Sequence, residues 1–157
     1  MPIEVVNVLG DEWDGPEREH PPGFRWRSLG VGRALGGELL GATVYELPPG
    51  EKTFPYHWHA ANEELLIVLA GRPTLRTPEG ERELERGDLV VFPRSPAGLH
   101  QVRNDSDEAA RLFLLSTRNV PEIVEYPDSG KVGITTGQGR PRLLRADAEI
   151  GYWDGEA

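Results

Sequence analysis

The most informative stretch of the chain is His57-Trp58-His59-Ala60-Ala61-Asn62-Glu63-Glu64, which runs directly into Leu65-Leu66-Ile67-Val68-Leu69-Ala70-Gly71. Side chains two residues apart on a β-strand project from the same face. His57 and His59 are therefore predicted to lie side by side, with Trp58 on the opposite face. The apolar run from 65 to 70 is far shorter than the about 20 residues of a membrane span and predicts a buried strand that ends at Gly71.

Glu64 stands at the head of this apolar strand, where a carboxylate is costly to bury unless it is paired or bound to a cation. If Leu66 and Val68 form the inner face of the strand, the alternation turns Glu64 inward and Glu63 outward. Two imidazoles and one inward carboxylate within eight residues predict a metal site.

A fourth ligand candidate comes from the next strand along the chain. Gly87-Asp-Leu-Val-Val-Phe-Pro93 is a strand bounded by glycine and proline, and His100 follows it. Three imidazoles and one carboxylate suit a single divalent Mn, Fe, Ni, Co or Zn ion better than Ca or Mg. The remaining histidine, His20, lies in a proline-rich segment and is read as an ordinary surface residue.

These two segments resemble the two motifs of the cupin superfamily. Residues 57–71 are similar to the first motif, and residues 87–93 with His100-Gln-Val-Arg-Asn104 are similar to the second, whose histidine supplies the fourth ligand. The resemblance implies a single-domain, double-stranded β-helix, which is a jelly-roll barrel. Two departures affect the mouth of the site: Gly50 precedes His57 by one residue more than usual, and the span from Pro93 to His100 is two residues longer.

The strand pattern on both sides agrees with an all-β fold that has little helix. Strands are predicted at residues 39–47, 64–70, 74–77, 81–84, 88–92, 99–103 and 110–117, with edge strands at 123–126, 131–134 and 142–144. We expect three parts: a mostly irregular N-terminal arm at 1–37 with one short strand, a barrel core at 38–120, and a C-terminal extension at 121–157 that packs on the barrel.

Composition narrows the function. The chain has no cysteine, which excludes thiolate metal sites and cysteine nucleophiles. Its formal net charge of −9 counts against nucleic acids and anionic membranes as partners. The first residues resemble no secretion signal, so a cytoplasmic location is the default expectation.

The chain as a whole is similar to small bacterial cupins of unassigned activity, some of which carry a provisional sugar-phosphate isomerase label. Three functions stay open: an isomerase for a sugar or sugar phosphate, an Fe(II)-dependent dioxygenase, and a non-catalytic protein that senses or binds a small ligand. Lys52, Arg94 and Lys131 are the candidates for binding an anionic substrate. The sequence singles out no general base.

Trp58 also bears on assembly. Because the flanking histidines turn it to the outer face, it becomes a large exposed aromatic unless something covers it. We therefore expect a homodimer with Trp58 at or near the interface.

Overall fold

The computed structural model describes residues 3–156, apart from the side chains of residues 18 and 19. Its strands are β1 (Arg18–Glu19), β2 (Arg25–Leu29), β3 (Leu40–Leu47), β4 (Trp58–His59), β5 (Glu64–Ala70), β6 (Thr74–Thr77), β7 (Gly80–Glu83), β8 (Leu89–Phe92), β9 (Gln101–Arg103), β10 (Ala110–Thr117), β11 (Glu122–Tyr126), β12 (Lys131–Thr135) and β13 (Arg142–Arg145). Helix is confined to α1 (Val31–Ala34) and to two 3₁₀ turns, Pro96–Gly98 and Pro127–Ser129. The predicted all-β fold is confirmed.

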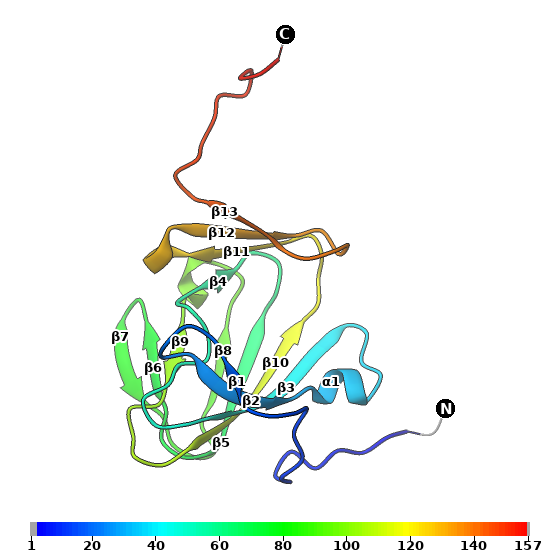
Figure 1. The fold of residues 1–157 in the computed structure, drawn as a ribbon, viewed down its shortest axis with the longest axis vertical. Helices are drawn as coiled ribbons and strands as arrows, with labels where there is room; N and C mark the ends of the chain where they lie inside the picture. Colours follow the sequence, from blue (N-terminus) through cyan, green and yellow to red (C-terminus); the bar gives the residue numbers. More distant parts are fainter. Residues whose placement is uncertain (1–2, 157) are drawn as a thin grey trace.

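The strands form three antiparallel sheets (Figure 1). One sheet has the order β1-β2-β3-β10-β5-β8, the second β13-β12-β11-β4, and the third β7-β6-β9. In Figure 1 the layer of β11, β12 and β13 lies at the top of the view, and the C-terminal chain leaves the barrel from β13. None of the helices in the described part of the chain is long and apolar enough to cross a bilayer.

The alternation of β5 places its inner face in the core. Leu66 and Val68 are almost fully buried, and they pack with Leu112 of the neighbouring β10. Glu64 has the same parity as these residues and therefore faces the barrel interior. The strand ends at Gly71, which has a positive φ of 78° and lies so close to Ala110 that a Cβ would stand 2.7 Å from its Cα. Only glycine fits this turn without displacing β10.

The N-terminal arm is more regular than the sequence indicates, because it contains β1, β2 and α1 where one short strand was expected. β2 pairs with β3 and so extends the large sheet. Trp26 is buried against Tyr45 and Phe54, and Trp13 lies under the guanidinium of Arg27. Trp26 thus joins the arm to side chains of the barrel, while the many glycines and charges of the arm hide its strand pattern in the sequence.

Candidate metal centre

Four side chains from three segments converge inside the barrel. His57 lies on the loop that enters β4, His59 ends β4, and Glu64 begins β5. His100 follows the 3₁₀ turn Pro96–Gly98, and its backbone exchanges two hydrogen bonds with that of His57, at 3.1 and 2.9 Å. This isolated bridge brings His100 to the other three residues, although it lies 36 residues after Glu64.

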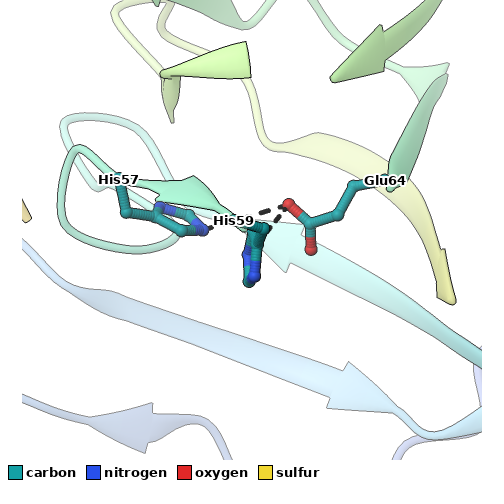
Figure 2. Close-up of side chains that lie close together, drawn as sticks. All are labelled: His57, His59 and Glu64. Atoms are coloured by element: carbon teal, nitrogen blue, oxygen red, sulfur yellow. Dashed lines mark ion pairs between the residues drawn. The ribbon is translucent and has the colours of Figure 1, made fainter. Parts of the chain in front are cut away.

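The Oε2 atom of Glu64 is common to the contacts of the cluster, and Figure 2 shows its ion pairs with His57 and His59. This oxygen is 3.9 Å from Nε2 of His57 and 3.4 Å from Nε2 of His59. The Nε2 atom of His100 lies 3.3 Å from the same oxygen. Ligand atoms bound at about 2.1 Å to one ion are roughly 3–4 Å apart, so these separations are compatible with a shared metal.

Each of the three rings is held through its other nitrogen. His57 Nδ1 lies 2.8 Å from the Pro55 carbonyl oxygen, and His100 Nδ1 lies 2.8 Å from the Gly98 carbonyl oxygen. A carbonyl oxygen only accepts, so each Nδ1 donates and each Nε2 has a lone pair directed into the site. This is the tautomer that a metal ligand requires.

Glu122, the first residue of β11, holds the third ring. Its buried carboxylate lies 3.3 Å from His59 Nδ1. The same carboxylate accepts hydrogen bonds from the backbone N–H groups of Ala60 and Ala61, at 3.1 and 2.9 Å, and from the side chain of Asn62. Glu122 was not predicted as a site residue: it lies more than 60 residues from His59 and one residue before the edge strand expected at 123–126.

Burial and neighbouring charges shift the pKa values of the four clustered side chains, in several cases in opposite directions. Burial lowers the pKa of His57 and brings the pKa of His100 to about 4, where the neighbouring His57 adds to the effect. Burial alone would also lower the pKa of His59, but the Glu64 and Glu122 carboxylates raise it above its ordinary value. The histidines hold the pKa of Glu64 low despite its burial. Three of the four groups are thus biased toward the form that binds a metal.

Two buried atoms in the cluster lack hydrogen-bond partners among the described residues. They are Nε2 of His59 and Oε2 of Glu64. An unsatisfied buried polar atom costs about 1–3 kcal/mol, and a cation between these atoms would satisfy both. The donor set of nitrogen and oxygen, the fixed tautomers and the two orphaned atoms fit a divalent transition metal.

A cavity of about 280 Å³ opens above the cluster. Its walls combine apolar side chains with hydroxyl groups, and it is lined by Gly41, Ala42, Thr43, Tyr45, Phe54, Pro55, His57, His59, Glu64, Leu114, Ser116 and Tyr126. The Tyr126 ring stacks on His57, with the ring centroids 5.9 Å apart. Burial and the Glu64 and Glu122 carboxylates raise the pKa of Tyr126, so its phenol is protonated at neutral pH.

A second, more open cavity of about 740 Å³ shares His59, Glu64 and Ser116 with the first. Arg118, just after β10, is the single cationic side chain among its lining residues. No ion pair of Arg118 with a described carboxylate is found. Arg118 therefore supplies free positive charge to the region around the metal cluster.

The three cations singled out from the sequence lie elsewhere. Lys52 and Lys131 line a separate cavity of about 640 Å³ on the other side of Phe54 and Pro55. Arg94 is exposed and lies outside the three cavities. The structure thus brings together the four predicted metal ligands but not the three predicted anion-binding residues, whose role stays a prediction.

Comparison with known proteins gives the same fold. The family model of the cupin domain matches residues 43–116. A solved structure from Acidithiobacillus ferrooxidans, provisionally named a sugar phosphate isomerase, has 26% sequence identity and a TM-score of 0.83; the match covers 94% of this chain and 96% of that one. Residues 43–116 therefore form a cupin domain, and the chain shares its fold with a solved structure of the cupin superfamily.

A second solved structure, named a sugar phosphate isomerase of the cupin superfamily from Silicibacter pomeroyi, has 29% identity and a TM-score of 0.73, with 82% of each chain covered. The polyketide cyclase RemF from Streptomyces resistomycificus has 20% identity and a TM-score of 0.60, with 77% of this chain and 84% of that one covered, and shows a shared fold alone. No curated protein matches the sequence.

Proposed function

We propose that this cupin is a divalent-metal-dependent isomerase for a small sugar phosphate. The observation that supports it most is the convergence of three Nε2 atoms and the Glu64 carboxylate beneath a cavity walled by hydroxyl groups. A metal bound by His57, His59, Glu64 and His100 would act as a Lewis acid toward a substrate carbonyl or hydroxyl oxygen. The two structural relatives named as sugar phosphate isomerases support the choice of reaction.

The chain's own residues would divide the remaining work. Thr43, Tyr45 and Ser116 present hydroxyl groups to the cavity, where they would orient a polyhydroxylated substrate. Tyr126 is protonated and adjacent to the cluster, so it would donate a hydrogen bond or a proton to the oxygen on which charge develops. Arg118 would bind the phosphate group at the outer end of the adjoining cavity.

The direct test measures proton exchange at the carbon next to the carbonyl. Purified protein is analysed for its metal, reloaded in turn with Mn, Fe, Co, Ni and Zn, and incubated in D₂O with a panel of aldose and ketose phosphates. We expect solvent deuterium in both members of one aldose–ketose pair and loss of exchange after chelation. Absence of exchange throughout the panel, with oxygen consumption by the iron form on a chelating substrate, would replace the isomerase by the dioxygenase.

Two variants separate the roles. Tyr126→Phe should lower kcat by about 10²–10⁴-fold with unchanged metal content, because it removes only a proton donor.

Arg118→Gln should raise KM for the phosphorylated substrate and leave the weaker turnover of the unphosphorylated sugar unchanged. Arg94→Gln, an exposed cation outside the cavities, is the matched control. A phosphate preference that survives Arg118→Gln but not Arg94→Gln would return the phosphate site to the residue predicted from sequence.

A further inference from the structure

Two parts of the molecule are unused by the metal centre: the C-terminal arm, residues 146–156, and the aromatic cavity, which is the 640 Å³ cavity beyond Phe54 and Pro55. We propose that the arm of one copy of the chain occupies the aromatic cavity of a second copy, so that two molecules exchange arms. This inference is independent of the proposed isomerase activity.

The arm exposes large apolar side chains to solvent. Ile150, Tyr152 and Trp153 are 80%, 86% and 75% exposed. After the bond from Ala146 N–H to the Gly130 carbonyl, the hydrogen bonds found in the arm join it only to itself or to Arg145. Figure 1 shows this segment leaving the barrel. Three large apolar side chains within four residues, all exposed to solvent, are typical of a segment that binds to another protein surface.

The charge of the arm is one-sided. It contains Asp147, Glu149, Asp154 and Glu156 and no lysine or arginine. Asp147 pairs with Arg145 at 2.6 Å, whereas no cationic partner is found for the other three within the described chain. The arm is thus an acidic and aromatic peptide in which Glu149, Asp154 and Glu156 have no cationic partner among the described residues.

The aromatic cavity has the complementary character. Its walls include Phe24, Trp26, Phe54 and Tyr56, and their lining is mainly apolar. This composition suits the packing of an indole or phenol ring.

Two of the lysine and arginine side chains that line the aromatic cavity, Lys52 and Lys131, have no acidic partner among the described side chains. The Lys52 ammonium lies 5.1 Å from the centroid of the Phe24 ring, and the Lys131 ammonium lies 5.4 Å from that of Tyr126. Neither has a carboxylate within 4 Å among the described side chains, whereas Arg76, on the same wall, is neutralised by Asp128 at 2.6 Å. The cavity therefore presents two unpaired cations to an occupant that brings unpaired acids.

The topology makes a reciprocal exchange possible. β13 pairs with β12 so that Arg145, the last residue before the arm, is opposite Lys131 at the rim of the cavity. The arm leaves at the rim of its own cavity, so a two-fold axis passing nearby places each arm over the cavity of the other copy. The eight residues from Ala146 to Trp153 reach up to about 26 Å when extended, enough to cross such an axis.

The area is also sufficient for a stable dimer. A tyrosine and a tryptophan each bury roughly 150–250 Å², so two exchanged arms, with both contacting surfaces counted, remove on the order of 1,200–2,000 Å² from water. This is the size of an ordinary specific interface. Trp58, on which the expectation of a dimer rests, is half-buried, and the exchanged arms would supply a contact that the sequence did not indicate.

Cysteine cross-linking tests the contact directly, because the chain has no native cysteine. Chains with Tyr152→Cys are mixed with size-tagged chains carrying Phe24→Cys and oxidised mildly. We expect a mixed disulfide dimer, and a much smaller yield when Phe24→Cys is replaced by Leu89→Cys on the opposite, exposed edge strand. An intramolecular disulfide in the doubly substituted chain, without mixed dimer, would mean that the arm folds back and would overturn the exchange.

Analytical sedimentation measures how much the arm contributes to the stability of the dimer. Removal of residues 146–157, or Trp153→Ala, should raise the dimer dissociation constant roughly 30-fold or more, the loss typical of an aromatic hot spot. Leu89→Ala should leave it unchanged. A dimer that tolerates the truncation but not Leu89→Ala would place the interface on the large sheet and refute the proposal. A wild-type chain that is monomeric throughout the micromolar range would refute it as well.

A charge-reversal variant tests the contribution of the two cavity lysines. Lys52→Glu combined with Lys131→Glu should weaken the dimer by a similar factor, and metal content measured in parallel should not change. If instead the full-length and truncated chains bind phenyl phosphate equally well, with the same quenching of Trp26, the cavity is a small-ligand site that the arm does not occupy.

Discussion

Single residues outside the ligand set control how the imidazoles are presented. The carboxylate of Glu122 accepts hydrogen bonds from four donors in residues 59–62 and a fifth from the backbone N–H of Ile123. It therefore fixes both the loop between β4 and β5 and the ring of His59. A buried carboxylate that binds the distal nitrogen of a ligand histidine also makes that ligand more basic.

Glu122→Gln should consequently lower metal affinity about 10–100-fold, because the amide –NH₂ cannot accept from the surrounding donors. The affinity is measured by competition with a chromogenic chelator. Glu125→Gln, three residues further along β11 and less buried, is the matched control and should retain wild-type affinity. Equal affinity in both variants would show that the ring of His59 is held by other contacts.

The low pKa of His100 predicts how the stability of the metal-free protein depends on pH. In the folded protein the pKa is about 4, and in the unfolded chain it is near the ordinary 6.5. Between these values the unfolded chain binds the additional proton, so stability falls as the pH drops from 6.5 toward 4. His57, whose pKa is also lowered, acts in the same direction, and His59 opposes them.

The contribution of His100 amounts to about 3 kcal/mol over this window. Urea unfolding of the chelated protein at pH 7 and at pH 4.5 measures it, with His100→Asn as the comparison, since asparagine does not titrate. We expect the wild type to lose more stability on acidification than the variant. Identical losses would contradict the assignment of the pH dependence to His100.

At the level of elements, the long loop between β8 and β9 still delivers His100 to the site. Its 3₁₀ turn packs Gly98 so tightly on Pro93 that a Cβ at Gly98 would lie 2.0 Å from the Pro93 carbonyl oxygen. The Gly98 carbonyl is also the acceptor for His100 Nδ1. The extra residues of this loop therefore form a compact turn and not a flexible insertion.

Gly98→Ala should destabilise the protein by about 2–4 kcal/mol, since the backbone of the turn must move, and should weaken metal binding through the displaced His100. Thermal unfolding of the chelated protein and chelator competition report the two effects separately. Ala97→Ser, at the exposed neighbouring position, should change neither. If Gly98→Ala lowered stability without changing metal affinity, the turn would support the fold but not orient the ligand.

Elements of strong local pattern were predictable, and those that depend on tertiary packing were not. The His-x-His spacing placed His57 and His59 on one face of a strand. The direction of Glu64 followed only on the condition that Leu66 and Val68 face the core, because the apolar run of β5 has no alternation of its own. Glu122 could not be found this way, because a lone glutamate just before a weakly patterned strand has no local signal of burial. β11 becomes an inner strand only through its pairing with β12 and β4. Lys52 and Lys131 were judged by proximity to the motif in sequence, whereas the wall of Phe54 separates them from the metal cavity.

On the scale of the whole molecule, a metal bound by His57, His59, Glu64 and His100 would join segments that are far apart in the chain. A ligand that binds only the folded state stabilises it by mass action, by about 2.7 kcal/mol at a metal concentration 100 times the dissociation constant. For a domain of this size such a gain raises Tm by about 5–10 °C. A metal held by this cluster would therefore stabilise the fold as well as serve the proposed reaction.

His57→Ala and His100→Ala should each remove most of the bound metal and most of the stabilisation that metal provides. Elemental analysis and calorimetry with and without chelator measure both. His20→Ala, at the exposed histidine outside the cluster, should keep wild-type metal content and the full difference in Tm. Unchanged metal content in either ligand variant would mean that the metal site is assigned to the wrong residues.

The shared parity of Glu64, Leu66 and Val68 also limits how this protein can vary through evolution. Substitutions along β5 can be tolerated one position at a time, but gain or loss of one residue between Glu64 and Val68 would reverse the direction of every side chain on one side of the change. Either the ligand would leave the barrel or the two core residues would reach the solvent. Insertions and deletions in the lineage should therefore accumulate in the loops around β5 and be absent from the strand itself.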